Sequence, residues 1–319
     1  MTTSTRLACA LAFAAFLAHP AAAAGAPPAT LERLHVASAL TAPQSFTFGV
    51  EGPAVDAAGN VYAVNFARQQ TIGKVKPNGE AEVFATLPGT SVGNGIRFGP
   101  DGAMYVADYV EHTIYRIDPA SGAIAIHARE SAMSQPNDLA ITAAGVIYAS
   151  DPDWKKSSGR VWRIERDGTV TLAADQLGTA NGIDVSPDGR TLYVNESVQR
   201  VVWAFAIAPD GTLGGKRRIA SFADHGLDGM RVDIDGNLYV TRIGKGTVVK
   251  LSPQGRILAE IALPGKKPSN LSFGGPDGRT AYVTEVENGQ LLQFRVARPG
   301  LEWQQRQGGP ARAAQSAAQ

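Results

Sequence analysis

The sequence predicts an all-β protein, a six-bladed β-propeller, on the strength of three observations. One pattern recurs six times at a spacing of 42 to 47 residues, and that period is the size of one four-stranded propeller blade. Glycine-containing turns separate short apolar runs throughout the repeat, as expected for many short strands. No amphipathic helical periodicity competes with this interpretation.

Each copy of the repeat has the same internal order. A polar residue with a side-chain oxygen comes first, followed by Gly or a near equivalent, a short apolar strand, an Asp-Gly or Gly-Asn turn, and a strand that contains Tyr. In the second copy, strands are expected at residues 95–98, 103–107, 113–117 and 124–127. Asp-Gly between apolar runs indicates a hairpin, because glycine adopts the positive φ that such turns need. The copies begin at Glu51, Asn94, Asn137, Asn181, Asp228 and Asn270.

The sixth copy provides only three strands. It reaches its third strand at residues 291–296 and then gives way to a polar tail. We expect residues 34–40 to supply the missing fourth strand and to close the ring, which would leave no open sheet edge. The propeller is therefore predicted to span residues 34–298.

The two ends of the chain are predicted to lie outside the propeller. Arg6, the apolar stretch at residues 7–18 and the alanines at 21–24 are typical of a signal peptide. Residues 1–24 are therefore expected to direct export to the periplasm or the medium, with an N-terminal anchor helix as the alternative. Residues 25–33 are expected to form a leader, and residues 299–319 a disordered tail. Cys9 is the only cysteine, so the mature chain would have no disulfide and no cysteine–zinc site.

The charge balance bears on the class of partner. The formal net charge is +1, whereas a nucleic-acid or anionic-membrane surface requires a concentrated basic face. The expected partner is a small-molecule substrate, with no nucleic acid and, after signal cleavage, no membrane.

The first residues of the six copies are expected to form a ring. Strand A of a blade is innermost, so these residues should lie at one face beside the central channel. All six carry side-chain oxygens, and Glu51 and Asp228 supply two negative charges. Oxygen ligands without Cys or His suit a hard divalent cation. The alternative is that the Asn and Asp residues cap turns.

A second ring is predicted around the first, at the ends of the second strands. We expect some of these residues to contact substrate or to transfer protons, Asp151 and Arg242 above all, together with Asn94 of the first ring. Arg242 could hold a carboxylate or an oxyanion. Solvated loop charges are the alternative. The members of the second ring are Asn65, Asp108, Asp151, Glu196, Arg242 and Glu285.

Two features near these rings have open roles. The loop at residues 152–160 contains Trp154 and is expected to overhang the same face, where it either shapes a pocket or has no role. His225 precedes Asp228 by three residues. It either assists proton transfer or is a solvated loop histidine, and the second interpretation is favoured.

Four short motifs resemble those of the senescence-marker-protein-30, gluconolactonase and luciferin-regenerating-enzyme family. They are EGP at residues 51–53, PND at 136–138, NGI at 181–183 and DGM at 228–230, within a resemblance that covers residues 45–296. The resemblance implies that Glu51, Asn137, Asn181 and Asp228 hold the metal and that Asp228 is also catalytic. The family usually has an aromatic residue where this chain has Val55, and this difference affects the expected pocket wall.

The reaction implied by this resemblance is metal-dependent hydrolysis of a lactone at the mouth of the channel. The expected cofactor is one divalent cation, Ca²⁺ in the first place, with Mg²⁺, Mn²⁺ or Zn²⁺ as alternatives. Two other functions remain open on the sequence alone. One is hydrolysis of a phosphotriester at the same metal site, and the other is a non-catalytic propeller that binds a ligand or a protein.

Overall fold

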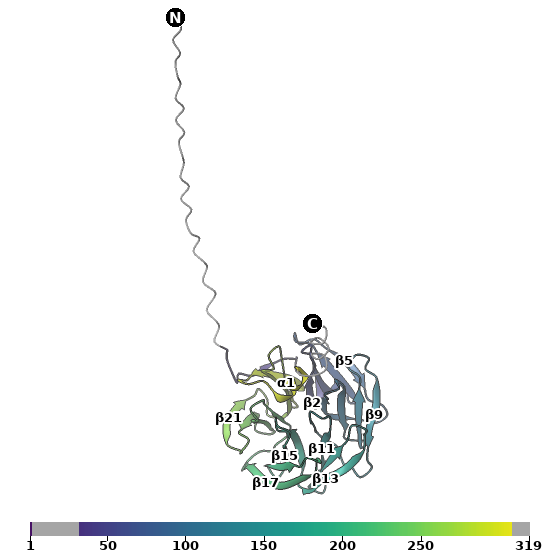
Figure 1. The fold of residues 1–319 in the computed structure, drawn as a ribbon. Helices are drawn as coiled ribbons and strands as arrows, with labels where there is room; N and C mark the ends of the chain where they lie inside the picture. The colour runs from purple at the N-terminus through teal and green to yellow at the C-terminus, as the bar shows by residue number, and fades with distance from the viewer. Residues whose placement is uncertain (2–31, 308–319) are drawn as a thin grey trace. The chain divides into compact units, whose positions relative to one another are not determined.

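The computed structural model describes residues 32–307 and Met1. In this part of the chain, strands form six four-stranded antiparallel sheets. Figure 1 shows the sheets arranged radially, with β5, β9, β13, β17 and β21 on the perimeter. This arrangement confirms the six-bladed propeller. The predicted signal peptide (1–24), most of the leader and residues 308–319 of the predicted tail lie outside the described residues.

The strands follow the repeat blade by blade. Blades 1 to 3 contain β2 (Phe46–Val55), β3 (Val61–Phe66), β4 (Thr71–Val75), β5 (Ala81–Thr86), β6 (Gly93–Phe98), β7 (Met104–Asp108), β8 (Thr113–Ile117), β9 (Ile124–Arg129), β10 (Leu139–Ile141), β11 (Ile147–Asp153), β12 (Ser158–Ile164) and β13 (Val170–Leu177). Blades 4 to 6 contain β14 (Ala180–Val185), β15 (Thr191–Glu196), β16 (Val201–Ile207), β17 (Leu213–Ser221), β18 (Met230–Val232), β19 (Leu238–Arg242), β20 (Thr247–Leu251), β21 (Ile257–Ala262), β22 (Pro268–Gly274), β23 (Thr280–Glu285) and β24 (Gln290–Arg295).

The turn between β6 and β7 shows how the repeated Asp-Gly works. Gly102 has φ of 79°, a left-handed conformation that glycine adopts at low cost. The side chain of Asp101 accepts a hydrogen bond from the backbone N of Ala103 at 3.1 Å. Together these features reverse the chain tightly, which places the first strand of the blade beside the second.

The N-terminal strand closes the last blade, as predicted. β1 (Ser38–Ala39) pairs antiparallel with β24. The closure continues at Thr41, whose hydroxyl accepts a hydrogen bond from the backbone N of Leu291 at 3.0 Å. The paired strand is shorter than the predicted 34–40, but it supplies the fourth strand of blade 6.

The repeated Tyr of each second strand packs in the core between neighbouring sheets. Tyr62 of blade 1 meets Phe98 of blade 2 with ring centroids 5.7 Å apart. Tyr239 of blade 5 meets Phe273 of blade 6 at 5.1 Å. Such edge-to-face pairs are stabilising beyond the area that they bury, so one residue type at one position of the repeat joins blade to blade.

A short helix, α1 (Leu301–Gln307), follows the last blade. The prediction of a disordered tail from residue 299 is therefore wrong for this segment. Leu301 is buried in the core cluster between blades 4 and 5, and the Trp303 indole donates to the backbone O of Gly275 at 3.0 Å. The polar composition of the residues that follow does not indicate these two contacts. Within the described residues, no helix has the length and apolar character needed to cross a bilayer.

Candidate metal and substrate site

The predicted first ring lies at or near the start of five of the inner strands, and Glu51 lies in the middle of the sixth, β2. Asn94 lies in β6, for example, while Asn137 and Asp228 come just before β10 and β18. Backbone hydrogen bonds join neighbouring blades at this level: Gly95 donates to Asn137 O at 2.7 Å, Gly182 to Asp228 O at 3.2 Å and Gly229 to Ser269 O at 2.6 Å. The ring residues of adjacent blades are therefore held side by side.

Glycine is required after several ring residues because the next blade approaches so closely. A Cβ at position 182 would lie 2.4 Å from Asp228 O, and a Cβ at position 229 would lie 2.1 Å from the Asn270 side chain. Both distances are shorter than any Cβ contact seen in real structures. The repeated pairs Asn-Gly and Asp-Gly at the strand starts are thus explained by interblade contact.

Glu51 and Asp228 bring two negative charges to the same place. The pKa of Glu51 is raised to about 7, chiefly by burial and also by the charge of Asp138, although a hydrogen bond from the backbone N of Gly52 at 2.9 Å opposes the shift. Burial and the charge of Glu51 also raise the pKa of Asp228 well above its ordinary value. Two carboxylates in this position repel each other unless a proton or a cation lies between them.

Asn181 adds a neutral oxygen beside this pair. Its Nδ2 donates to Ser197 Oγ at 3.0 Å, and its side chain also hydrogen-bonds to Asp228. Among the described residues, the Oδ1 atom of Asn181 is buried and has no hydrogen-bond partner. A buried amide oxygen without a partner costs free energy, and a cation would satisfy it.

The donor set fits a hard cation. Carboxylate and amide oxygens are the ligands that Ca²⁺ and Mg²⁺ take in proteins. Over residues 32–307, no cluster of three or more His, Cys, Asp or Glu side chains could hold a metal. A cation at the ring would therefore use amide oxygens as well as the Glu51 and Asp228 carboxylates.

Asp138 is a member of this site that the sequence reasoning missed. It is fully buried, and its Oδ2 accepts hydrogen bonds from Arg231 Nη1 at 2.8 Å and from Asn270 Nδ2 at 3.2 Å. Its charge acts on both Glu51 and Asp228. The available signal was an exception in the repeat, because Asp138 stands where four of the six copies have Gly.

Below the ring, the channel is filled by buried ion pairs. Arg97 lies 3.6 Å from both Asp184 and Glu302, and Arg231 lies 3.9 Å from Glu302. Glu302 belongs to α1, which packs against the turns at the far ends of the inner strands. The helix α1 therefore lies at the ends of the inner strands that are remote from the ring.

The carboxylates of the second ring anchor loops. Asp151 is 1% exposed. Its carboxylate accepts hydrogen bonds from the backbone N of Ser134 and Gln135 and from the Trp162 indole. The carboxylate of Glu285 likewise accepts from the backbone N of Lys267 and Asn288. This geometry favours a structural role for Asp151 over the predicted contact with substrate.

Arg242 and Asn94, the other predicted substrate contacts, are also engaged within the protein. Arg242 is buried, donates to the backbone O and the carboxylate of Asp224, and lies 4.0 Å over the Phe222 ring. Asn94 Nδ2 donates to the backbone O of Asn137 at 3.3 Å. Arg242 is thus directed into its own loop, and Asn94 stays at the ring beside a predicted ligand.

A pocket of about 360 Å³ opens beside the ring, and Asp228 is part of its wall. The Trp154 loop reaches this pocket, so of the two roles left open for that loop, the geometry favours shaping the pocket. His225 also lines this pocket.

Val55 is buried at the end of β2 and packs beneath Gly274, so the residue type at that position does not alter this pocket wall. The lining residues are Trp154, Ser197, Val198, Arg200, His225, Gly226, Asp228 and Ile243.

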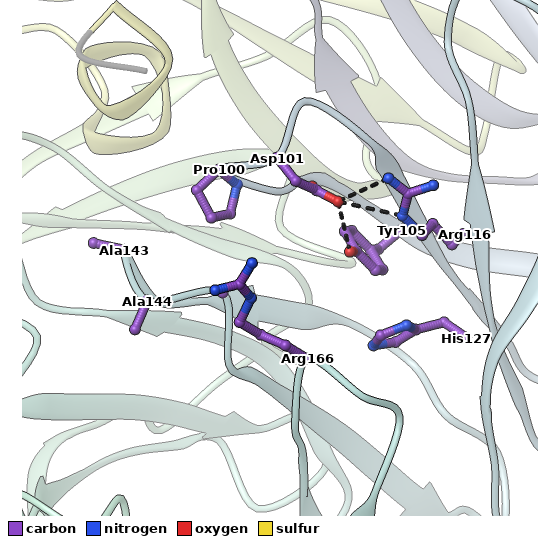
Figure 2. Close-up of a pocket in the computed structure, with 9 residues that line it drawn as sticks. Pro100, Asp101, Tyr105, Arg116, His127, Ala143, Ala144 and Arg166 are labelled. Atoms are coloured by element: carbon purple, nitrogen blue, oxygen red, sulfur yellow. Dashed lines mark hydrogen bonds and ion pairs between the residues drawn. The ribbon is translucent and has the colours of Figure 1, made fainter. Parts of the chain in front are cut away.

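A second cavity, of about 470 Å³, lies away from the ring (Figure 2). Asp101 from the turn after β6 accepts hydrogen bonds there from Tyr105 at 3.1 Å and from Arg116 at 3.0 and 3.2 Å. No ring residue lines it. The charged groups that Figure 2 joins by dashed lines already satisfy one another, so this cavity is not the candidate site.

Comparison with known proteins identifies the family. Residues 49–287 match the SMP-30/Gluconolactonase/LRE-like region. The chain belongs to this family. The match confirms the resemblance expected from the EGP, PND, NGI and DGM motifs.

Relatives within the SMP-30/gluconolactonase family include several lactonases. A gluconolactonase of Zymomonas mobilis is 28% identical over 243 residues, 67% of each chain. A pentonolactonase of Haloferax volcanii is 32% identical over 151 residues, and the match covers 46% of this chain and 52% of the relative. This chain thus spans about two thirds of the first relative's length and about half of the second's.

Solved structures agree on the architecture. A gluconolactonase of Xanthomonas campestris superimposes with a TM-score of 0.71 at 25% identity, over 82% of this chain and 89% of that one. A calcium-binding regucalcin of Agrobacterium tumefaciens gives a TM-score of 0.71 at 22% identity, over 82% and 94% of the two chains. At that identity, the second likeness shows the fold alone.

Proposed function

We propose that this protein hydrolyses a lactone with the help of one divalent cation held at the ring. The observation that carries the proposal is the pairing of Glu51 and Asp228 beside the unpartnered Oδ1 of Asn181. Asp228 also forms part of a pocket wall, so one member of the charged pair lies where a small ligand can reach it. Membership of a family that contains lactonases supports the same reaction.

The ligands of the cation would be Glu51, Asn137, Asn181 and Asp228. Their oxygens favour Ca²⁺, and Mg²⁺, Mn²⁺ or Zn²⁺ are the other candidates. When bound, such a cation supplies Lewis acidity, which polarises a carbonyl and lowers the pKa of water. Asp138 and Asn270 would hold the surrounding shell in place through their mutual hydrogen bond.

Asp228 is the proposed proton acceptor. Water adds to the lactone carbonyl carbon, the ring C–O bond breaks, and the product is a hydroxy acid. One proton leaves the attacking water and one reaches the departing ring oxygen, so a single carboxylate can accept the first and return it as the second. The backbone of Asp228 is fixed by hydrogen bonds to Thr241 and from Gly182, so its carboxylate is held at the pocket.

A substrate panel with controlled metal content tests the proposal. The protein is stripped with chelator and assayed on aldonolactones, aromatic lactones and phosphotriesters, with Ca²⁺, Mg²⁺, Mn²⁺ or Zn²⁺ restored in turn. We expect lactone turnover that disappears on chelation and returns with a divalent cation. Turnover of phosphotriesters alone, or lactone turnover indifferent to chelation, would contradict the proposal.

A further inference from the structure

The pocket beside Asp228 changes in character from its floor to its rim. Ser197 and Asp228 are only 6% and 8% exposed, and Ser197 contacts the predicted ligand Asn181. Trp154 and Val198 are 40% and 58% exposed, and Ile243 adds a third large apolar side chain to the lining. The buried floor is therefore polar, whereas the more exposed part of the lining combines these three large apolar side chains with two polar residues, Arg200 and His225.

The rim is built by equivalent loops of three consecutive blades. Trp154, Val198 and Ile243 follow β11, β15 and β19 closely, in the loops that lead to the third strand of blades 3, 4 and 5. The second-ring residues Asp151 and Glu196, at the ends of the first two of these strands, anchor this region by accepting hydrogen bonds from the indoles of Trp162 and Trp203. The apolar side chains are thus carried on supported loops.

A polyhydroxylated lactone matches this rim poorly. Each of its hydroxyl groups loses water on binding, which costs free energy unless a protein group replaces that water. Val198 and Ile243 have no polar side-chain atoms and Trp154 has one N–H donor, so on the exposed part of the lining only Arg200 and His225 could pair with several hydroxyl groups. An alkyl or aryl substituent is instead stabilised when it leaves water for these side chains.

We propose that the substrate is a lactone with an apolar alkyl or aryl substituent, which lies against Trp154, Val198 and Ile243 while the lactone carbonyl faces Asp228. This inference rests on the lactone hydrolysis proposed above and specifies the class of lactone.

Turnover of a chain-length series gives the first test. We expect kcat/KM to rise at least about tenfold from γ-valerolactone to γ-octalactone, since each buried methylene is worth up to about fourfold in affinity, and γ-octalactone to exceed D-glucono-δ-lactone. Val198→Ser should remove most of this preference, mainly through KM. Val110→Ser should keep it, because Val110 is exposed in the corresponding loop of blade 2 but does not line the pocket. A faster reaction with gluconolactone, unchanged in Val198→Ser, would overturn the inference and leave lactone hydrolysis standing.

Binding of lactams separates the two proposals, because lactams resist hydrolysis. Calorimetry measures the affinity of each lactam. We expect 5-butyl-2-pyrrolidinone to bind at least about tenfold more tightly than 5-methyl-2-pyrrolidinone, because each additional buried methylene is stabilising. Val198→Ser should abolish the difference. If no lactone is turned over but this preference holds, lactone hydrolysis is refuted and the apolar specificity of the pocket stands. Equal affinity for the two lactams would refute the specificity.

Discussion

Replacing Asp228 by asparagine is expected to lower kcat/KM for lactone hydrolysis by about 100- to 10,000-fold, the usual contribution of a general base. The substitution keeps the shape of the side chain and removes its charge. The same change should raise the free energy of unfolding of the chelated protein at pH 8, because it ends the repulsion between Asp228 and Glu51. Activity is measured by steady-state kinetics and stability by urea unfolding.

Asp188→Asn is the matched control for this variant. Asp188 is exposed in the turn between β14 and β15, where it accepts hydrogen bonds from Ser186 and the backbone N of Arg190. It lies at the end of β14 that is remote from the ring, so kcat/KM should stay within twofold or so of the wild-type value. Wild-type activity in Asp228→Asn would refute its assignment as the proton acceptor.

Replacing Arg231 by methionine is expected to destabilise the fold by about 3–5 kcal/mol, the usual cost of breaking a buried ion pair from one side. Arg231 is fully buried and pairs with Asp138 at 2.8 Å. Burial disfavours the charged form of the Arg231 side chain. The negative charges of Asp138, Glu302 and Asp184 outweigh that effect and raise the pKa of Arg231. Without it, Asp138 would be left beside Glu51 and Asp228 with less compensation. The free energy of unfolding in urea measures the loss.

Arg116→Met provides the comparison for Arg231→Met. Arg116 pairs with Asp101 at 3.0 Å, but its side chain is 43% exposed, and surface pairs of this kind contribute about 0–1 kcal/mol. An equal loss in the free energy of unfolding in the two variants would show that the buried ion pairs of the channel contribute no more to stability than a surface pair.

The repeat explains how much of this fold the sequence could predict. Blade positions and the ring at the strand starts follow from the period, because equivalent positions in a closed ring of sheets lie at one level. In blade 2, the third strand was predicted with the bounds that β8 has, and the fourth is two residues longer than predicted. Closure by the N-terminal strand followed from the missing fourth strand of blade 6.

The repeat could not predict contacts between side chains that are far apart in the sequence. The position of Asp151 at the end of a strand could be predicted, but not that the loop at residues 134–135 returns to bind its carboxylate. The anchoring of α1 depends on Glu302 reaching Arg97 and Arg231, contacts that no local pattern encodes. The apolar pocket rim arises where three loops meet, and each loop alone resembles an ordinary surface connection.

Calorimetric titration of the chelated protein with Ca²⁺ tests most directly whether the oxygens of Glu51, Asn137, Asn181 and Asp228 converge on one cation. We predict one bound ion per chain, with affinity at least about tenfold weaker at pH 6 than at pH 8. Glu51 has a pKa of about 7 and the pKa of Asp228 is also raised, so Ca²⁺ must displace protons from its ligands in the more acidic buffer. Glu51→Gln should lose tight binding, whereas Glu82→Gln on the exposed outer strand β5 should keep both the affinity and its pH dependence. Absence of binding in the wild-type protein, or equal binding in Glu51→Gln, would contradict the cation site.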